Sequence, residues 1–179
     1  KLKMFVHAEE VLSTVPLKDE DLTLFVRLGT DFVDNYYEYE LPLYKTNWGA
    51  TLPEDIWPEL NNMEIVFDDL LGLKKKRNDL IDGGSTSVSY VLEYSDIDPN
   101  NPNRKIKVKG SPNLQGVKTL MIGVRNPGKN TNDTWPDDGM AKCVNVWINE
   151  LRLTDFVSEG GSAAVAQMQV QLADFANVS

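Results

Sequence analysis

The stretch "LTLFVRLGTDFVDNYYEYELPL", residues 22–43, decides the fold class. Apolar residues stand at every second position up to Gly29, and the alternation returns from Tyr37 to Leu43. A period of two is typical of β-strands that turn one face to a core. The Gly-Thr-Asp and Asp-Asn strings between the two runs favour compact turns. The stretch therefore predicts two strands separated by turns, with Leu22, Leu24, Val26 and Leu28 on one face of the first.

The same period marks further strands at residues 1–7, 87–94, 104–109, 117–125 and 144–153. The segment 104–109 (RKIKVK) is predicted to lie at a sheet edge, because edge lysines discourage unwanted pairing. Turn-rich segments at 82–85, 96–103 and 126–139 separate the strands. About seven or more strands joined in this way predict a mainly β fold, an antiparallel two-sheet β-sandwich of jelly-roll type with one short helix.

The predicted helix follows Asp68. Met63, Ile65 and Phe67 alternate as a strand, and DLLGLKKKRN then places acids first and cations last, the order that a helix dipole favours. We expect a helix of about two to three turns, and a longer helix from Pro58 is the alternative. The run Lys74–Arg77 is interpreted as the solvated C-terminal turn of this helix.

The segment "KCVNVWINELRLTDF", residues 142–156, is predicted to be the closing strand. Val144, Val146 and Ile148 share the inner face. Leu151 and Leu153 then fall out of phase, together with Trp147. A β-bulge near Asn149-Glu150 would re-aim these side chains, so a bulge is expected there.

Composition limits the function classes. The chain has 179 residues, is 41% hydrophobic and carries a net charge of −9, so we expect a folded domain and no nucleic-acid partner. The single cysteine, Cys143, lies in an apolar run and is expected to be a buried thiol. The single histidine, His7, limits any triad or multi-histidine metal site to one histidine.

No catalytic, cofactor-binding or metal-binding residue is predicted. Asp96-x-Asp98-x-Asn100 begins like a calcium loop, but Asn101 and Lys107 stand where that loop needs Gly and Glu. A looser structural calcium site in the loops stays open as an alternative to turn-forming aspartates. Glu38 and Glu40 share a strand face and could serve glycoside hydrolysis, but a polar outer face is the simpler interpretation.

Aromatic residues suggest a binding surface. Trp57-Pro58 and Trp135-Pro136 are expected in loops, where binding residues concentrate. We predict a candidate interaction surface made of Tyr36, Trp48, Trp57 and Trp135. Sugar rings could stack on it, although some of these rings could instead cap the ends of the core.

The C-terminal stretch 163–172 alternates apolar residues with glutamines at 167, 169 and 171. Such a pattern is typical of a transmembrane β-barrel strand. A soluble edge strand or an amphipathic helix is the alternative.

Three stretches resemble one known family: "FVRLGTDFVDNYYEYELPL" (25–43), "IWPELNNMEI" (56–65) and "VWINELRLTDF" (146–156). They resemble the SprA (Sov) family of giant outer-membrane proteins of Bacteroidetes. Gly160-Gly161 and "LADF" (172–175) continue the likeness, whereas Ser162 stands where relatives often have Trp. The chain begins at Lys1 and is expected to be an internal domain: a sandwich over 1–156, then a linker over 157–179 with a strand returning to the parent barrel.

The resemblance implies a parent that is the translocon of the type 9 secretion system, linked to gliding motility. The domain would then be a non-catalytic scaffold, exposed to the periplasm or the cell surface. Its partners would be the rest of the barrel, secreted proteins or accessory subunits. A carbohydrate-binding module that takes glycans is the alternative function. A jelly-roll glycosidase, which needs two carboxylates facing each other across a cleft, is a weaker third hypothesis.

Overall fold

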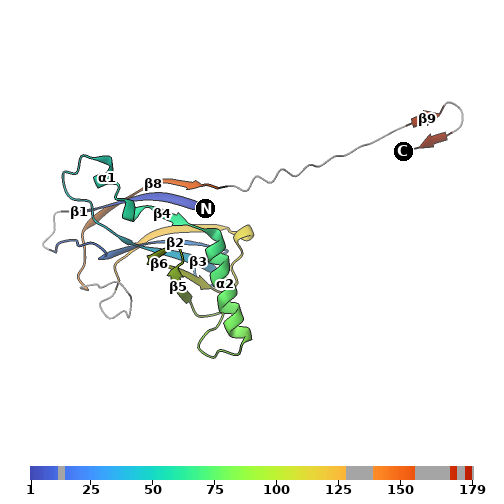
Figure 1. The fold of residues 1–179 in the computed structure, drawn as a ribbon, viewed down its shortest axis with the longest axis horizontal. Coiled ribbons are helices and arrows are strands. Elements are labelled where there is room, and N and C mark those ends of the chain that lie inside the picture. The colour runs from blue at the N-terminus through green and yellow to red at the C-terminus, as the bar shows by residue number, and fades with distance from the viewer. Residues whose placement is uncertain (12–14, 128–138, 156–169, 173–175, 179) are drawn as a thin grey trace.

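The computed structural model describes residues 1–11, 15–127, 139–155, 170–172 and 176–178. Within them, two antiparallel sheets form the two layers of a sandwich (Figure 1). Along the chain the elements, with η1 and η2 as short 3₁₀ helices, are β1 (Leu2–Glu10), β2 (Leu22–Gly29), β3 (Tyr36–Leu43), α1 (Pro53–Ile56), η1 (Glu59–Asn61), β4 (Met63–Ile65), α2 (Phe67–Asp82), β5 (Tyr94–Asp98), β6 (Asn101–Lys109), η2 (Leu114–Gly116), β7 (Thr119–Arg125), β8 (Val144–Leu153), β9 (Val170–Leu172) and β10 (Ala176–Val178).

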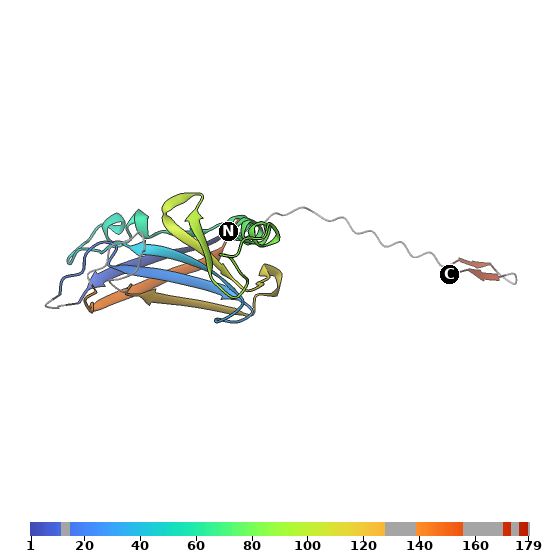
Figure 2. The same ribbon diagram turned by 90° about the horizontal axis from the view of Figure 1, so that it is seen from below.

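The larger sheet has the strand order β5-β6-β3-β2-β7, and the smaller has the order β4-β1-β8. Figure 2 shows the two layers from the side, with β8 (orange) and β7 (gold) along the same side of the sandwich. All strand pairs in the two sheets are antiparallel. The predicted mainly β fold with two antiparallel sheets is confirmed. The jelly-roll connection stays a prediction, as does the domain boundary at residue 156.

The core lies between the sheets, where the alternation predicts it. Leu24 pairs with Leu41 and Val26 with Tyr39, and all four side chains are buried. From the smaller sheet, Met4 and its neighbours on β1 and β4 pack against them. The helix α2 packs on β6 and β5, and it adds buried leucines to the same core.

The predicted bulge in the closing strand is confirmed. Phe5 pairs with Asn149 and Lys3 pairs with Arg152, so β8 places two residues, Glu150 and Leu151, opposite the single residue Met4 of β1. Glu150 at this point has a positive φ of 55°. After the bulge Leu153 lies opposite the buried Leu2, which places it on the inner face of the sheet.

Several sequence predictions about residues 63–109 are wrong. The strand predicted at 87–94 instead begins at Tyr94. The predicted loop 96–103 comprises the end of β5, the start of β6 and, at 99–100, the turn between them. The segment 104–109 is not at an edge, because β6 lies between β3 and β5. The helix α2 is 16 residues long and a separate short helix, α1, precedes it. The Lys74–Arg77 run therefore lies in the middle of a helix and not in its last turn.

Cys143 also departs from its prediction, because the structure exposes it to solvent. It stands just before β8, at the edge of the smaller sheet, where its carbonyl oxygen accepts a hydrogen bond from Val11 N at 3.0 Å. The tail prediction for 163–172 lies mostly outside the described residues. Of that stretch the structure describes the backbone of 170–172, which pairs with 176–178 as β9 and β10.

Replacement of Gly29 by alanine should destabilise the fold. A Cβ there would lie 2.0 Å from the backbone oxygen of Asn35 and 2.7 Å from Tyr36 Cα, where β2 meets β3. Backbone cannot give way as a flexible side chain can, so we expect a loss of about 2–3 kcal/mol in the free energy of unfolding. Urea denaturation measures it.

The matched control is Gly72→Ala in α2, where a Cβ would meet nothing within 4 Å. There alanine removes a helix-destabilising glycine and should stabilise by about 0.5–1 kcal/mol. Equal effects of the two substitutions would contradict the packing described for the β2–β3 hairpin.

Candidate interaction sites

A loop beside β1 forms one end of the molecule. Residues 44–58 are held to β1 by Thr46, whose backbone N–H donates to Ala8 O at 2.6 Å. The buried Asn61 secures the start of the loop: it accepts from Tyr44 N at 2.8 Å and donates to Tyr44 O at 2.7 Å. These bonds fix the loop against the smaller sheet.

Three adjoining cavities, of about 520, 440 and 370 Å³, open between this loop and the sheet. Asn47 lines all three, so they lie side by side around this residue, and we describe them together as one groove. Its indole side chains come from Trp48, Trp57 and Trp147. We call this feature the aromatic groove.

His7 supports one wall of the aromatic groove. Its ring is buried, and Nδ1 donates a hydrogen bond to the carbonyl oxygen of Ile56 at 2.7 Å. The ring centroid lies 5.7 Å from that of Trp57 and 5.7 Å from that of Trp147. Thr46 Oγ1 donates to the same Ile56 oxygen at 3.1 Å. The bonds to Ile56 therefore hold the groove in one shape.

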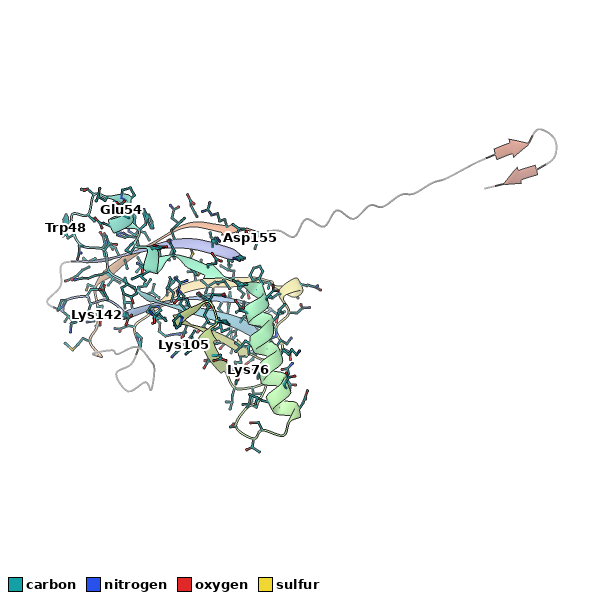
Figure 3. All side chains as sticks on the ribbon, in the orientation of Figure 1. Trp48, Glu54, Lys76, Lys105, Lys142 and Asp155 are labelled. Carbon is teal, nitrogen blue, oxygen red and sulfur yellow. The ribbon has the colours of Figure 1, made fainter. Side chains whose placement is uncertain are left out.

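The groove mixes aromatic rings with carboxylates and amides. The carboxylate, ammonium and amide side chains that line it are Glu9, Glu10, Lys45, Asn47, Glu54, Asp55 and Asn145. Figure 3 shows Trp48 and Glu54 together at one end of the sandwich. Rings beside amides and carboxylates can stack on and hydrogen-bond to a sugar or to an extended peptide.

Of the four residues predicted as an interaction surface, two meet in this groove. Trp48 is 86% exposed and Trp57 is partly buried against His7. Tyr36 is buried, so the structure removes it from that surface: its ring lies 3.8 Å from the Arg27 guanidinium, and its hydroxyl donates to Glu93. Trp135 lies outside the described residues.

Trp147 and His7 also line the groove but were not predicted as site residues. The sequence does indicate their position, because both alternate with the inward-facing residues of their strands and so belong to the outer face. Trp147 alternates with Val146, and His7 pairs directly with Trp147 across the sheet. Directly opposed residues share one face, so the two rings lie together on the outer face.

Glu38 and Glu40 lie on the outer face of the larger sheet, as predicted, but they are buried within an ion-pair cluster. Glu38 contacts Arg27 at 2.5 Å and Arg125 at 3.1 Å, and Glu40 contacts Lys107 at 2.7 Å. The Phe25 ring covers Gly123 on the neighbouring strand, with the Arg125 guanidinium 4.6 Å from its centroid. Both carboxylates are thus paired with cationic side chains.

The surroundings of the two carboxyl groups shift their pKa values in opposite directions. Burial would raise the pKa of Glu38, but Arg125, Arg27 and Lys107 together hold that pKa below its ordinary value. Burial raises the pKa of Glu40, although Lys107 opposes the rise. Because each carboxylate already holds a cation, the pair resembles a structural network and gives the glycosidase hypothesis no support.

A second surface lies where β7 and β8 form the free edges of the two sheets. Among the described residues neither strand pairs with a further one on its outer side. Leu120 and Val124 pair with buried leucines of β2, and Ile148 pairs with the buried Val6, so all three side chains turn inward. They nevertheless stay 39–42% exposed. We call this feature the open seam; it comprises Leu120, Val124, Ile148, Leu151 and Leu153.

The described residues contain no cluster of three or more His, Cys, Asp or Glu side chains placed to hold a metal ion. The carboxylates of the discarded calcium motif are used internally, because Asp96 pairs with Lys76 and Asp98 accepts from Tyr39 OH at 2.7 Å. None of the helices in the described part of the chain has the length and hydropathy needed to span a bilayer.

A family model described as "Motility related/secretion protein" (SprA_N) matches residues 1–179, the whole chain. The chain belongs to the SprA_N family. The resemblance found in the sequence is therefore confirmed, and no curated protein matches the chain. The family is described by motility and secretion and not by an enzyme activity. The aromatic groove and the open seam are thus surfaces of a motility- and secretion-related domain.

Removal of the Glu38 charge should strongly destabilise the fold. Glu38→Gln leaves Arg27, Arg125 and Lys107 on the outer face with one central carboxylate in place of two. Loss of one partner from a buried ion-pair network costs about 3–5 kcal/mol. Chemical denaturation at neutral pH measures the change.

Glu64→Gln serves as the matched control. Glu64 also contacts two cations, Lys1 at 2.7 Å and Lys3 at 2.9 Å, but its side chain is well exposed. Exposed pairs contribute less than about 1 kcal/mol. A Glu38→Gln loss as small as that of the control would show that the outer-face cluster does not stabilise the fold.

Proposed function

We propose that this chain is a non-catalytic structural and interaction domain of an outer-membrane protein-secretion channel, the type 9 translocon of Bacteroidetes, which also serves gliding motility. Membership of a motility and secretion family supports the proposal. The domain would sit in a protein of the outer membrane and face the periplasm or the cell surface. It would need no cofactor, although a structural calcium is compatible with this role.

The open seam is the observation that carries the proposal. Four of its five aliphatic side chains pair with buried residues across the sheets, and all five remain 39–47% exposed. To bury the rest of them would contribute about 3–6 kcal/mol. The free edges of β7 and β8 also offer backbone hydrogen bonds to an added strand. A domain built in this way is completed by a neighbour, which we take to be the rest of the parent barrel.

The aromatic groove gives the domain a second contact surface, at the loop end of the sandwich. Secreted proteins or accessory subunits would bind there. Trp48 is the side chain expected to contribute most, because a large exposed indole gains the most from burial.

A carbohydrate-binding module is the second candidate function, and the groove is the observation that favours it. Its indoles, amides and carboxylates are the groups that sugar-binding sites use. Affinity electrophoresis in gels that contain cell-wall polysaccharides would decide. Saturable retardation that disappears in Trp48→Ala but persists in Trp147→Ala would establish a module centred on Trp48. Neither substitution changes the net charge, so mobility in a gel without polysaccharide should be the same for both. No retardation in any polysaccharide would favour the scaffold.

Charges placed in the open seam should block secretion without unfolding the domain. Leu120→Lys and Ile148→Lys each introduce an ammonium that can reach water from a half-exposed site, so the thermal midpoint should change little. Docking should weaken by about tenfold or more, since each variant loses about 1.4 kcal/mol or more of contact. The measurement is the amount of a type 9 cargo protein released by cells that carry each variant.

Val33→Lys is the control, because Val33 is 66% exposed and stands in the turn before β3, outside the seam. Its cargo release should equal that of the wild type. Normal release from both seam variants would rule out the seam as a docking surface.

A further inference from the structure

Arg77 stands apart from the other cations of the domain. It lies in the middle of α2 and is completely buried. Its Nε and Nη2 atoms donate to the amide oxygen of Asn78, at 3.2 and 3.0 Å. Its Nη1 atom is buried and has no hydrogen-bond partner among the described residues. No described carboxylate forms an ion pair with it.

A guanidinium keeps its charge in proteins, so this site holds a cation that has lost its water. An uncompensated buried charge costs several kcal/mol. The ring of Tyr90, whose centroid lies 4.9 Å from the Arg77 guanidinium carbon, offsets part of that cost by a cation–π contact. Burial lowers the pKa of Arg77, while Tyr90 and Tyr37 oppose the shift.

A second cation beside Arg77 also lacks an anion among the described residues. Lys74 lies one turn earlier on the same face of α2, and Nζ donates to the neutral carbonyl of Pro112 at 2.8 Å. Burial lowers the pKa of Lys74, and the charge of Arg77 adds to the effect. Neutral oxygens are therefore the only hydrogen-bond acceptors that the described residues give Arg77 and Lys74.

The cover over Arg77 is a segment without regular structure. Residues 85–93 connect α2 to β5 and are held by few backbone bonds, among them Gly110 N to Tyr90 O at 2.8 Å and Ser85 N to Leu80 O at 3.0 Å. The Tyr90 side chain is 43% exposed. A small displacement of that ring would open a path from solvent to Arg77.

We propose that Arg77 and Lys74 form an oxyanion-binding site beneath Tyr90, which takes one carboxylate or phosphate group. A planar guanidinium with a free N–H binds a flat or tetrahedral oxyanion more strongly than it binds a neutral oxygen. The ammonium of Lys74 supplies further donors. The site uses the cationic run of α2, and it is independent of the aromatic groove and the open seam.

Isothermal titration calorimetry and thermal melting of the whole chain test the site. The ligands are sodium phosphate and sodium acetate, and sodium chloride at equal ionic strength is the control. Phosphate or acetate should bind to the wild type, and at a tenfold excess over Kd it should raise the midpoint by about 3–5 °C above chloride. A stronger response to phosphate would indicate a phosphate ligand, and a stronger response to acetate would indicate a carboxylate of a polypeptide.

Arg77→Met should abolish the difference between anions, and Lys75→Met should keep it, because Lys75 is exposed on the same helix. Lys74→Met tests the site without loss of the buried Arg77 charge and should weaken binding by about tenfold. An equal anion response in the wild type and Arg77→Met would overturn the proposal. So would a wild type that responds no more to phosphate or acetate than to chloride, since the site would then show no preference for an oxyanion.

Discussion

The antiparallel register of β2 against β3 is the constraint on which the rest of the structure depends. It sets Leu24 opposite Leu41 on the core side and Arg27 opposite Glu38 on the outer side. A slip of either strand by one residue would move all the core side chains of that strand to the outer face. The buried bonds from Arg27 and Arg125 to Glu38 hold the register from outside, while the core holds it from inside. Both faces of one hairpin thus specify the larger sheet, on which α2 and the smaller sheet pack.

Strands whose apolar residues alternate regularly could be predicted from the sequence. Segments whose alternation is compatible with more than one set of paired residues could not. The hairpin and the bulge at Asn149-Glu150 follow from the alternation and from the point where it slips. The segment 87–94 alternates as well, yet the residues paired with β6 are 94–98, because cross-strand partners decide and not local pattern. Two predictions based on charge were also wrong. The lysines of β6 do not mark a sheet edge but face the glutamates of β3, and Arg77 is not solvated but buried.

The residues of the candidate sites also divide into those that could be predicted from the sequence and those that could not. Trp48 and Trp57 could be predicted as surface rings because they stand near prolines and turns. Tyr36 could not be separated from them, since its burial depends on Arg27 and Glu93 from distant parts of the chain. Trp147 joins the groove through its pairing with His7 across the sheet. That the described residues give Arg77 no counter-ion could not be predicted from the sequence, because it depends on how α2 packs.

The central claim is that this sandwich is completed by a neighbour along β7 and β8. Amide hydrogen exchange of those strands tests it directly, in this chain alone and in the outer-membrane protein that we propose as its parent. We expect the amides on the free edges of β7 and β8 to exchange quickly in the chain alone and to be protected by at least about a hundredfold in the parent. Equal exchange in the two forms would contradict the claim.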